Sequence, residues 1–204
     1  MTRRDDSKAE TRELILKTAR LLFWEKGAGK CTIREIALEA GVSPASIIVH
    51  FKNKTALLEA TLHEEIETNL SKAIVNLPRG QDLPGVLMHI VSRMLAVYDK
   101  NRDLYRVLIR DTYYEPLHDS PSIARLDEEY KQFIVEMIER EKDKGHFKND
   151  LDSNLAAWSI VYLYLGVLRK FLINPDFSAA DAESTIAAML QQLISGLLWH
   201  GEKQ

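Results

Sequence analysis

The stretch TIREIALEAGVSPASIIVHFKNK, residues 32–54, decides the fold of this chain. Its first part carries apolar residues at helical spacing behind Thr32, a residue type favoured at the N-cap of a helix. Gly41 allows the positive φ that a sharp turn often needs. Ser43 and Pro44 then begin a second helix, because Ser is favoured at the N-cap and Pro at the first helical position. We therefore predict two short helices joined by a turn, which is a helix-turn-helix unit.

The remainder of the chain is also predicted to be helical. Apolar residues recur every three or four positions, and glycine or proline ends most runs. The expected helices span residues 8–26, 54–77, 83–99, 102–115, 121–144, 151–173 and 179–200. Because alternation typical of strands is absent, we predict an all-α protein of about nine helices. An N-terminal three-helix domain is expected at residues 1–54 and a C-terminal helical domain at residues 55–204.

Charge is distributed unevenly along the chain. The net charge is −3, but residues 1–54 hold eleven Lys and Arg against seven Asp and Glu, a net of +4 that leaves −7 for the remainder. Such asymmetry is expected when one segment faces nucleic-acid phosphates. The single cysteine, Cys31, excludes an internal disulfide, and no apolar signal-peptide stretch follows the basic N-terminus, so we expect a cytoplasmic protein. The apolar run at residues 155–168 is shorter than the roughly 20 residues that span a bilayer, so a buried helix and no membrane partner are expected.

The segment CTIREIALEAGVSPASIIVHFKNKTALLEA, residues 31–60, follows a helix that ends at Gly27 and resembles the TetR family of transcription repressors. The motif covers about the first 60 residues, and the rest agrees in length and helical character. The resemblance implies a homodimer whose N-terminal domains bind a palindromic double-stranded DNA operator. It also implies that residues 55–204 dimerise and bind a small-molecule effector that releases the operator.

The resemblance places a set of residues at the DNA: Thr32, Arg34, Ser43, Pro44, Ala45, Ser46, His50 and Lys54. Val49 is a further DNA-binding candidate for a separate reason. Thr32 and the N–H groups beside it can hold a phosphate, since a helix N-terminus favours anions. Arg34 can pair with a phosphate or a guanine edge, or can instead be a solvated arginine paired with a neighbouring glutamate. Ser46 can bond a base or a phosphate. Lys54 is predicted to bind the phosphate backbone, with a surface lysine as the alternative.

Ile48 and Val49 depart from the family pattern, in which an aromatic residue, often Tyr, is common at one or both positions. Apolar side chains cannot donate to a phosphate, but they can contact thymine methyl groups. We hypothesise that apolar contacts to A·T pairs partly replace a phosphate contact. Alternatively, Ile48 packs with Ile47 and Phe51 in the three-helix core, and the sequence leaves both open.

Aromatic residues and methionines of the C-terminal part are the candidate effector contacts. Three predicted helices carry them at three- and four-residue spacing: Met94, Tyr98, Tyr130, Phe133, Met137, Trp158 and Tyr162. Core packing alone produces the same spacing, so each residue has a purely structural alternative. Together they predict a largely apolar pocket with phenolic hydroxyls as its polar groups, suited to a small apolar or aromatic effector.

The last two predicted helices have more apolar surface than one intramolecular core requires. Small residues among them, such as Gly166 and Gly196, allow close helix approach. We therefore expect a four-helix interface across a twofold axis, as the family resemblance also implies.

Enzymatic function has little support in the sequence, and no cofactor, metal or catalytic residue is assigned. Gly27, Gly29 and Lys30 lack the spacing of a phosphate-binding loop and are better explained as a helix end. His63 and Glu67 share a helix face, which a solvated pair explains better than a metal site. The alternative function is a helical ligand-binding or protein-interaction module that has lost DNA binding.

Overall fold

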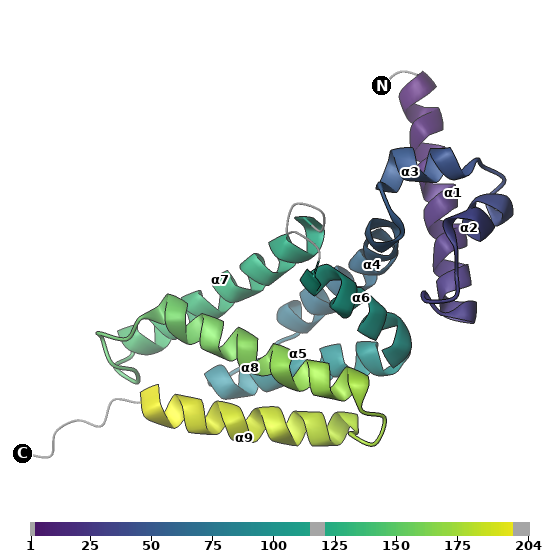
Figure 1. Cartoon of the computed structure of the whole chain (residues 1–204). Coiled ribbons are helices and arrows are strands. Elements are labelled where there is room, and N and C mark those ends of the chain that lie inside the picture. Colours follow the sequence, from purple (N-terminus) through teal and green to yellow (C-terminus); the bar gives the residue numbers. More distant parts are fainter. Residues whose placement is uncertain (1–2, 115–120, 198–204) are drawn as a thin grey trace, which may run out of the picture. The chain divides into compact units, whose positions relative to one another are not determined.

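The computed structural model describes residues 3–114 and 121–197, which form nine α-helices (Figure 1). The helices are α1 (Arg3–Lys26), α2 (Ile33–Glu39), α3 (Pro44–Phe51), α4 (Lys54–Val75), α5 (Leu83–Asp99), α6 (Arg102–Tyr114), α7 (Pro121–Asp143), α8 (Ser153–Ile173) and α9 (Ala179–Leu197). The all-α prediction is confirmed within these residues. Helix ends agree to within a few residues, apart from α1, which begins at Arg3 instead of near Lys8.

The described residues group into two compact units. Unit 1 comprises those of Met1–Thr68 and Asn101–Ala124, and unit 2 those of Asn69–Lys100 and Arg125–Gln204. The chain therefore passes between the units three times: within α4, between α5 and α6, and within α7. The domain boundary expected after Lys54 divides the chain by function. Helix α4 begins at that residue and continues without a break into unit 2, so this boundary stays a prediction.

Unit 1 is built on the packing of α1 against α2 and of α2 against α3. Its core contains fully buried side chains from all three helices, including Ile15, Phe23, Ile36 and Ile47. The sharp end of α1 is explained by Gly27, whose φ of 79° is accessible to glycine at little cost.

Unit 1 also contains the first part of α4 and all described residues of α6. Leu57, Leu58 and Leu62 form the buried stripe of α4, spaced as a helix face requires. Tyr105 of α6 is fully buried, and its hydroxyl donates to Glu65 Oε2 of α4 at 3.1 Å. This bond fixes α6 to α4 inside unit 1.

In unit 2, α9 packs against both α5 and α8. Its buried side chains recur every four residues, at Ala182, Ile186, Leu190 and Ile194. By length and composition alone α8 is long and apolar enough to cross a membrane, so the sequence argument from a short apolar run does not hold for the whole helix. Core helices of soluble proteins pass the same test, and packing against α9 accounts for the apolar face of α8.

Candidate nucleic-acid interface and effector cluster

The start of α2 is closed by a complete capping box. Thr32 Oγ1 accepts from the Glu35 backbone N–H at 3.2 Å, while Glu35 Oε2 accepts from the Thr32 backbone N–H at 2.8 Å and from its hydroxyl at 2.9 Å. The hydrogen bonds from Thr32 lower the pKa of the Glu35 carboxyl below its ordinary value. A phosphate approaching Thr32 therefore meets an ionised carboxylate, and the phosphate contact predicted for Thr32 requires that Glu35 swing away.

The start of α3 is set by Ser43 and Pro44, as the sequence predicts. Ser43 Oγ accepts from the Ser46 backbone N–H at 3.1 Å, and Pro44 occupies the first turn of the helix. The turn before it uses Gly41 at a φ of 65°. Because the Ser46 side chain carries none of this capping, its hydroxyl is left for an outside partner.

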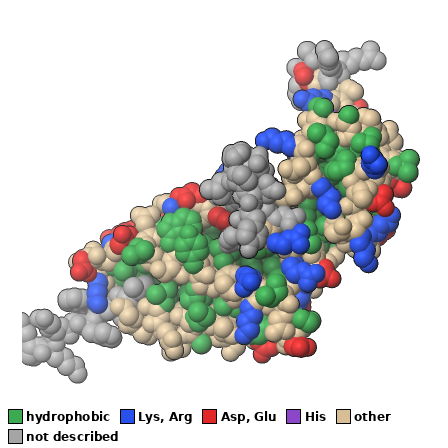
Figure 2. Space-filling model, viewed as in Figure 1, with side chains coloured by type: hydrophobic (Ala, Val, Ile, Leu, Met, Phe, Trp, Pro, Cys, Tyr) green, Lys and Arg blue, Asp and Glu red, His purple; other side chains and the backbone are tan. Residues whose placement is uncertain are grey.

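The two faces of α3 differ sharply in burial. Ile47 is fully buried and Phe51 is 5% exposed, whereas Ile48 is 46% and Val49 76% exposed. The core alternative for Ile48 is therefore not what the structure shows, since Ile47 and Phe51 alone fill that role. In Figure 2 exposed hydrophobic side chains lie beside Lys and Arg side chains over the part of unit 1 that contains α1 to α3.

The remaining DNA-facing candidates are accessible to different degrees. Arg34, Pro44 and Ala45 are exposed, and His50 is half-buried. No acidic residue occurs in α3. The outward face is therefore apolar and hydroxyl-bearing, and basic residues lie near it in sequence.

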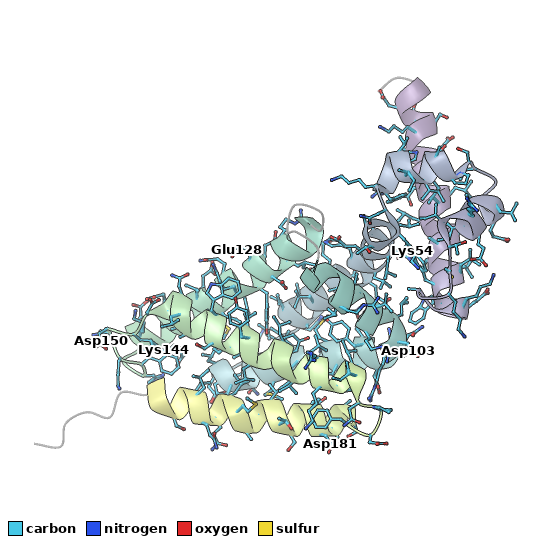
Figure 3. All side chains as sticks on the ribbon, viewed as in Figure 1. Lys54, Asp103, Glu128, Lys144, Asp150 and Asp181 are labelled. Atoms are coloured by element: carbon cyan, nitrogen blue, oxygen red, sulfur yellow. The ribbon has the colours of Figure 1, made fainter. Side chains whose placement is uncertain are left out.

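Lys54, at the start of α4 (Figure 3), is held by the loop between α1 and α2. Its Nζ donates to the carbonyl oxygens of Ala28 at 2.7 Å and Cys31 at 3.0 Å. An ammonium group has three N–H donors, so one remains for a phosphate. Lys54 is thus a structural clamp of unit 1, and its predicted DNA contact stays a prediction.

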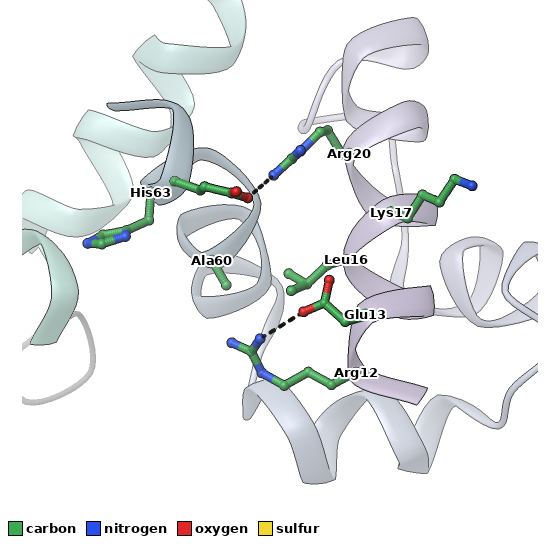
Figure 4. Close-up of a pocket in the computed structure, with 8 residues that line it drawn as sticks. Arg12, Glu13, Leu16, Lys17, Arg20, Ala60 and His63 are labelled. Atoms are coloured by element: carbon green, nitrogen blue, oxygen red, sulfur yellow. Dashed lines mark hydrogen bonds and ion pairs between the residues drawn. The ribbon is translucent and has the colours of Figure 1, made fainter. Parts of the chain in front are cut away.

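A groove of about 310 Å³ lies between α1 and α4 in unit 1 (Figure 4). Arg20 bridges it, with Nε donating to the Thr61 carbonyl at 3.2 Å and its Nη2 to Glu64 at 3.2 Å. The lining is mostly charged and polar: Arg12, Glu13, Leu16, Lys17, Arg20, Ala60, His63 and Glu64. Small-molecule sites are usually mainly apolar, so this groove is better explained as a polar brace between the helices.

The aromatic candidates of unit 2 are only partly brought together. Tyr130 and Phe133 stack with ring centroids 6.5 Å apart, and Trp158 stacks on Tyr162 at 5.2 Å. Tyr162 is nevertheless 63% exposed, so it does not belong to the buried core of unit 2.

Two of the effector candidates, Met94 and Tyr98, are on α5 and lie inside unit 2, and a third, Met137 of α7, is half-buried. Met94 is 4% and Tyr98 6% exposed, so both belong to its core.

Two further residues of this region were not among the sequence candidates. Tyr164 of α8 is hydrogen-bonded to Tyr98, and Asp127 of α7 is close enough for its charge to act on both phenols. Burial raises the pKa of Tyr98 to about 12 and that of the Asp127 carboxyl to about 6. Asp127 precedes Tyr130 by three residues, so the two share a helix face, and this spacing was the available signal.

A capped two-helix unit with an apolar, acid-free outward helix, set in a basic segment, defines the class of helix-turn-helix DNA-binding regulators. Residues 15–61 match the model described as "Bacterial regulatory proteins, tetR family". The regulator YvkB of Bacillus subtilis is 30% identical over 159 residues, covering 76% of this chain and 80% of that protein. The chain therefore belongs to the TetR family, it is a transcriptional regulator, and it is not an enzyme.

Two further relatives, each covering 92% of this chain, agree with this assignment. UidR of Escherichia coli is 24% identical over 196 residues, covering 92% and 93%. YerO of Bacillus subtilis is 27% identical over 206 residues, covering 92% of this chain and 66% of that protein.

The fold has solved counterparts. The Thermus thermophilus repressor FadR, crystallised with lauroyl-CoA, superimposes with a TM-score of 0.77 at 19% identity, covering 95% of this chain and 98% of that one. Since the identity is low, this likeness concerns the fold alone.

Proposed function

We propose that this regulator is a repressor that binds a palindromic operator as a homodimer and leaves it when a small, largely apolar or aromatic effector binds unit 2. The observation that carries DNA binding is the outward face of α3, where Val49 is 76% exposed beside half-exposed Ile48. An isolated apolar face of this kind is costly in water and gains most from a partner. The major groove offers thymine methyl groups to such a face.

The proposed DNA contacts are those of the capped unit. Ser43, Pro44 and Ala45 begin the recognition helix, where N-terminal residues meet base edges, and Arg34 on α2 is exposed for a phosphate or guanine. We expect the protein to act in the cytoplasm, where an operator is accessible.

Homodimerisation is proposed through α8 and α9. Exposed apolar side chains remain on both helices of unit 2, namely Leu155 at 66% and Met189 at 42%. A second copy would cover them across a twofold axis, and two recognition helices contact more base pairs than one. Sedimentation of Leu155→Glu combined with Met189→Glu should give a monomer, and an unchanged dimer would reject this interface.

The effector is proposed to bind near Tyr98, Tyr130, Phe133 and Trp158. FadR was solved with lauroyl-CoA, whose acyl chain is apolar, so the fold can accommodate a ligand of this general character. In the present chain the aromatic residues favour an apolar or aromatic body.

Fluorescence anisotropy on labelled DNA that flanks the protein's own gene tests the proposal. We expect binding that weakens steeply with salt and is lost in Val49→Glu, because a carboxylate would face the DNA. Val75→Glu is the matched control, since Val75 is 82% exposed at the end of α4 in unit 2. Absence of binding at low salt would instead favour a ligand-binding module that has lost DNA binding.

A further inference from the structure

Helix α3 is joined to α4 by a strained turn at Lys52. This residue has a φ of 60° and a ψ of −55°, and among the residues that the structure describes it alone has a positive φ without being a glycine. The Asn53 N–H donates to the Phe51 carbonyl at 2.6 Å, which closes a γ-turn. This form of the γ-turn is rare and costs free energy in a residue with a side chain, so surrounding contacts must stabilise it.

Helix α1 contacts the chain on both sides of this turn. Before the turn, the Arg12 guanidinium lies 5.1 Å from the centroid of the Phe51 ring at the end of α3. After the turn, Arg20 donates from Nε to the Thr61 carbonyl and from Nη2 to the Glu64 carboxylate, each at 3.2 Å (Figure 4). Both arginines line the groove between α1 and α4, about 12 Å apart along the helix axis.

The Arg20 contact fixes the direction of α4 more than it stabilises the fold. The Arg20 and Glu64 side chains are 45% and 78% exposed, and exposed ion pairs contribute little to folding. The guanidinium is a planar fork, however, and two of its donors bond acceptors one turn apart on α4. Such a two-point contact across the groove restricts the angle between α1 and α4.

We propose that Arg12 and Arg20 are positioning residues for DNA binding. By contacting both sides of the Lys52 turn, they set the angle at which α3 presents its outward face. This inference rests on the proposed function in one respect, because that face is taken to be the DNA-binding surface. The placing of α3 by α1 is a property of unit 1 and can be measured without DNA.

Arg20→Lys tests the role while keeping the charge, because a single ammonium group cannot reproduce the two-point contact. We expect affinity for the operator to fall about tenfold, since base contacts require a defined helix angle. Affinity for a duplex of unrelated sequence at low salt should stay within about twofold, since phosphate contacts tolerate other angles. Lys17→Arg, in the same groove, is the matched control and should change neither affinity. Equal changes on the two duplexes would overturn the proposal.

Glu64→Ala gives a result that charge alone cannot produce. Removing a negative charge should strengthen DNA binding if only electrostatics matters. The proposal instead predicts operator binding about threefold weaker, since Arg20 loses one of its two acceptors. Glu25→Ala removes the same charge at an exposed position near the end of α1 and should not weaken binding. Operator affinity in Glu64→Ala equal to or above that in Glu25→Ala would reject the Arg20 contact.

The Arg12 contact has its own test. Arg12→Gln removes the cation beside Phe51, and Lys8→Gln removes the same charge at an exposed position one turn earlier. Operator affinity should fall about threefold further in Arg12→Gln than in Lys8→Gln. Equal losses in the two variants would come from charge alone and would reject the positioning role of Arg12.

Hydrogen exchange of the free protein separates this inference from the proposed function. Peptides from α3 and the Lys52 turn should exchange about threefold faster in Arg20→Lys than in the wild type, because the turn opens more often. Peptides from α2 are the internal control, since α2 packs directly against α1.

The two failures then give different results. If exchange rises in Arg20→Lys but the wild type binds no DNA, the positioning of α3 by α1 stands and DNA binding fails. If exchange is unchanged in Arg20→Lys, the inference fails, and normal binding of the operator by the wild type would leave the regulator standing.

Discussion

Val49 is the most exposed apolar side chain of α3, whereas Ile47 and Phe51 are buried in the core of unit 1. If it contacts a thymine methyl, Val49→Ala should lower operator affinity by about 1 kcal/mol, or roughly fivefold. The measurement is anisotropy on a selected operator and on the same operator with uracil in place of thymine. Uracil lacks the methyl group, so the wild type should lose affinity on it.

The uracil operator also supplies the result that would contradict the thymine contact. On the uracil operator, Val49→Ala should cost nothing further, since the methyl partner is already absent. Equal losses on the thymine and uracil operators would show that Val49 acts in another way, for example on the position of α3.

At Asp127 the raised pKa has a consequence for stability that needs no ligand. Its ordinary value is 3.8 and the folded value is about 6, so between these pH values the folded protein holds a proton that the unfolded chain has released. Stability contributed by this group is therefore greatest at low pH and is lost as pH rises through 6. Tyr98 and Tyr164, on whose phenols its charge acts, do not titrate in this range, since burial raises their pKa values further above the ordinary 10.0.

The substitution Asp127→Asn should accordingly stabilise the free protein at pH 7 by about 2 kcal/mol, because it removes a buried negative charge. The gain should shrink towards zero near pH 4, where the wild-type carboxyl is also neutral. Urea unfolding followed by circular dichroism at both pH values measures it. A variant that is less stable than the wild type at pH 7 would show that the carboxylate has a favourable partner.

For the elements of unit 1, Lys54 matters more as a clamp than as a surface charge. Lys54→Met keeps the apolar stem but removes hydrogen bonds to the carbonyls of Ala28 and Cys31, so we expect a loss of about 2 kcal/mol in the free energy of unfolding. Lys30→Met is the control, because Lys30 is exposed in the loop before α2 and carries the same charge.

Both lysine variants lose one positive charge, so a similar reduction in the salt dependence of DNA binding would come from charge alone. Only Lys54→Met should unfold at lower urea concentration. Equal urea midpoints for the two variants would contradict the clamp.

Elements set by neighbouring residues were predictable from the sequence. The capping of α3 by Ser43 and the turn at Gly41 involve residues within a few positions of one another, and both are confirmed. The Lys54 contacts join residues 26 and 23 positions apart, and the hydrogen bond between Tyr105 and Glu65 joins residues 40 positions apart. Such contacts depend on tertiary packing, which periodicity alone does not reveal, and exposure of Tyr162 was missed for the same reason.

At the scale of the whole molecule, the order in which the chain passes through its two units suggests how the proposed effector control could work. The chain leaves unit 1 within α4, forms α5 in unit 2 and re-enters unit 1 at Asn101. Tyr98, one of the proposed effector contacts, is near the end of α5, and Tyr105, seven residues later, is hydrogen-bonded to Glu65 of α4. A ligand that displaces the end of α5 would therefore act on α6 and, through Tyr105, on the helix that carries α3 at its start.

Tyr105→Phe removes the hydroxyl that joins α6 to α4 and keeps the buried ring. Operator affinity without ligand should stay within about twofold, while the loss of affinity caused by a small aromatic probe, 1-naphthalenemethanol, should fall by about 1 kcal/mol of coupling free energy. Anisotropy titrations with and without this probe measure both quantities, and Tyr162→Phe, at an exposed position, is the control. An unchanged ligand effect in Tyr105→Phe would place the coupling elsewhere than in the bond between α6 and α4, because a ligand shifts an equilibrium only through contacts that differ between its two states.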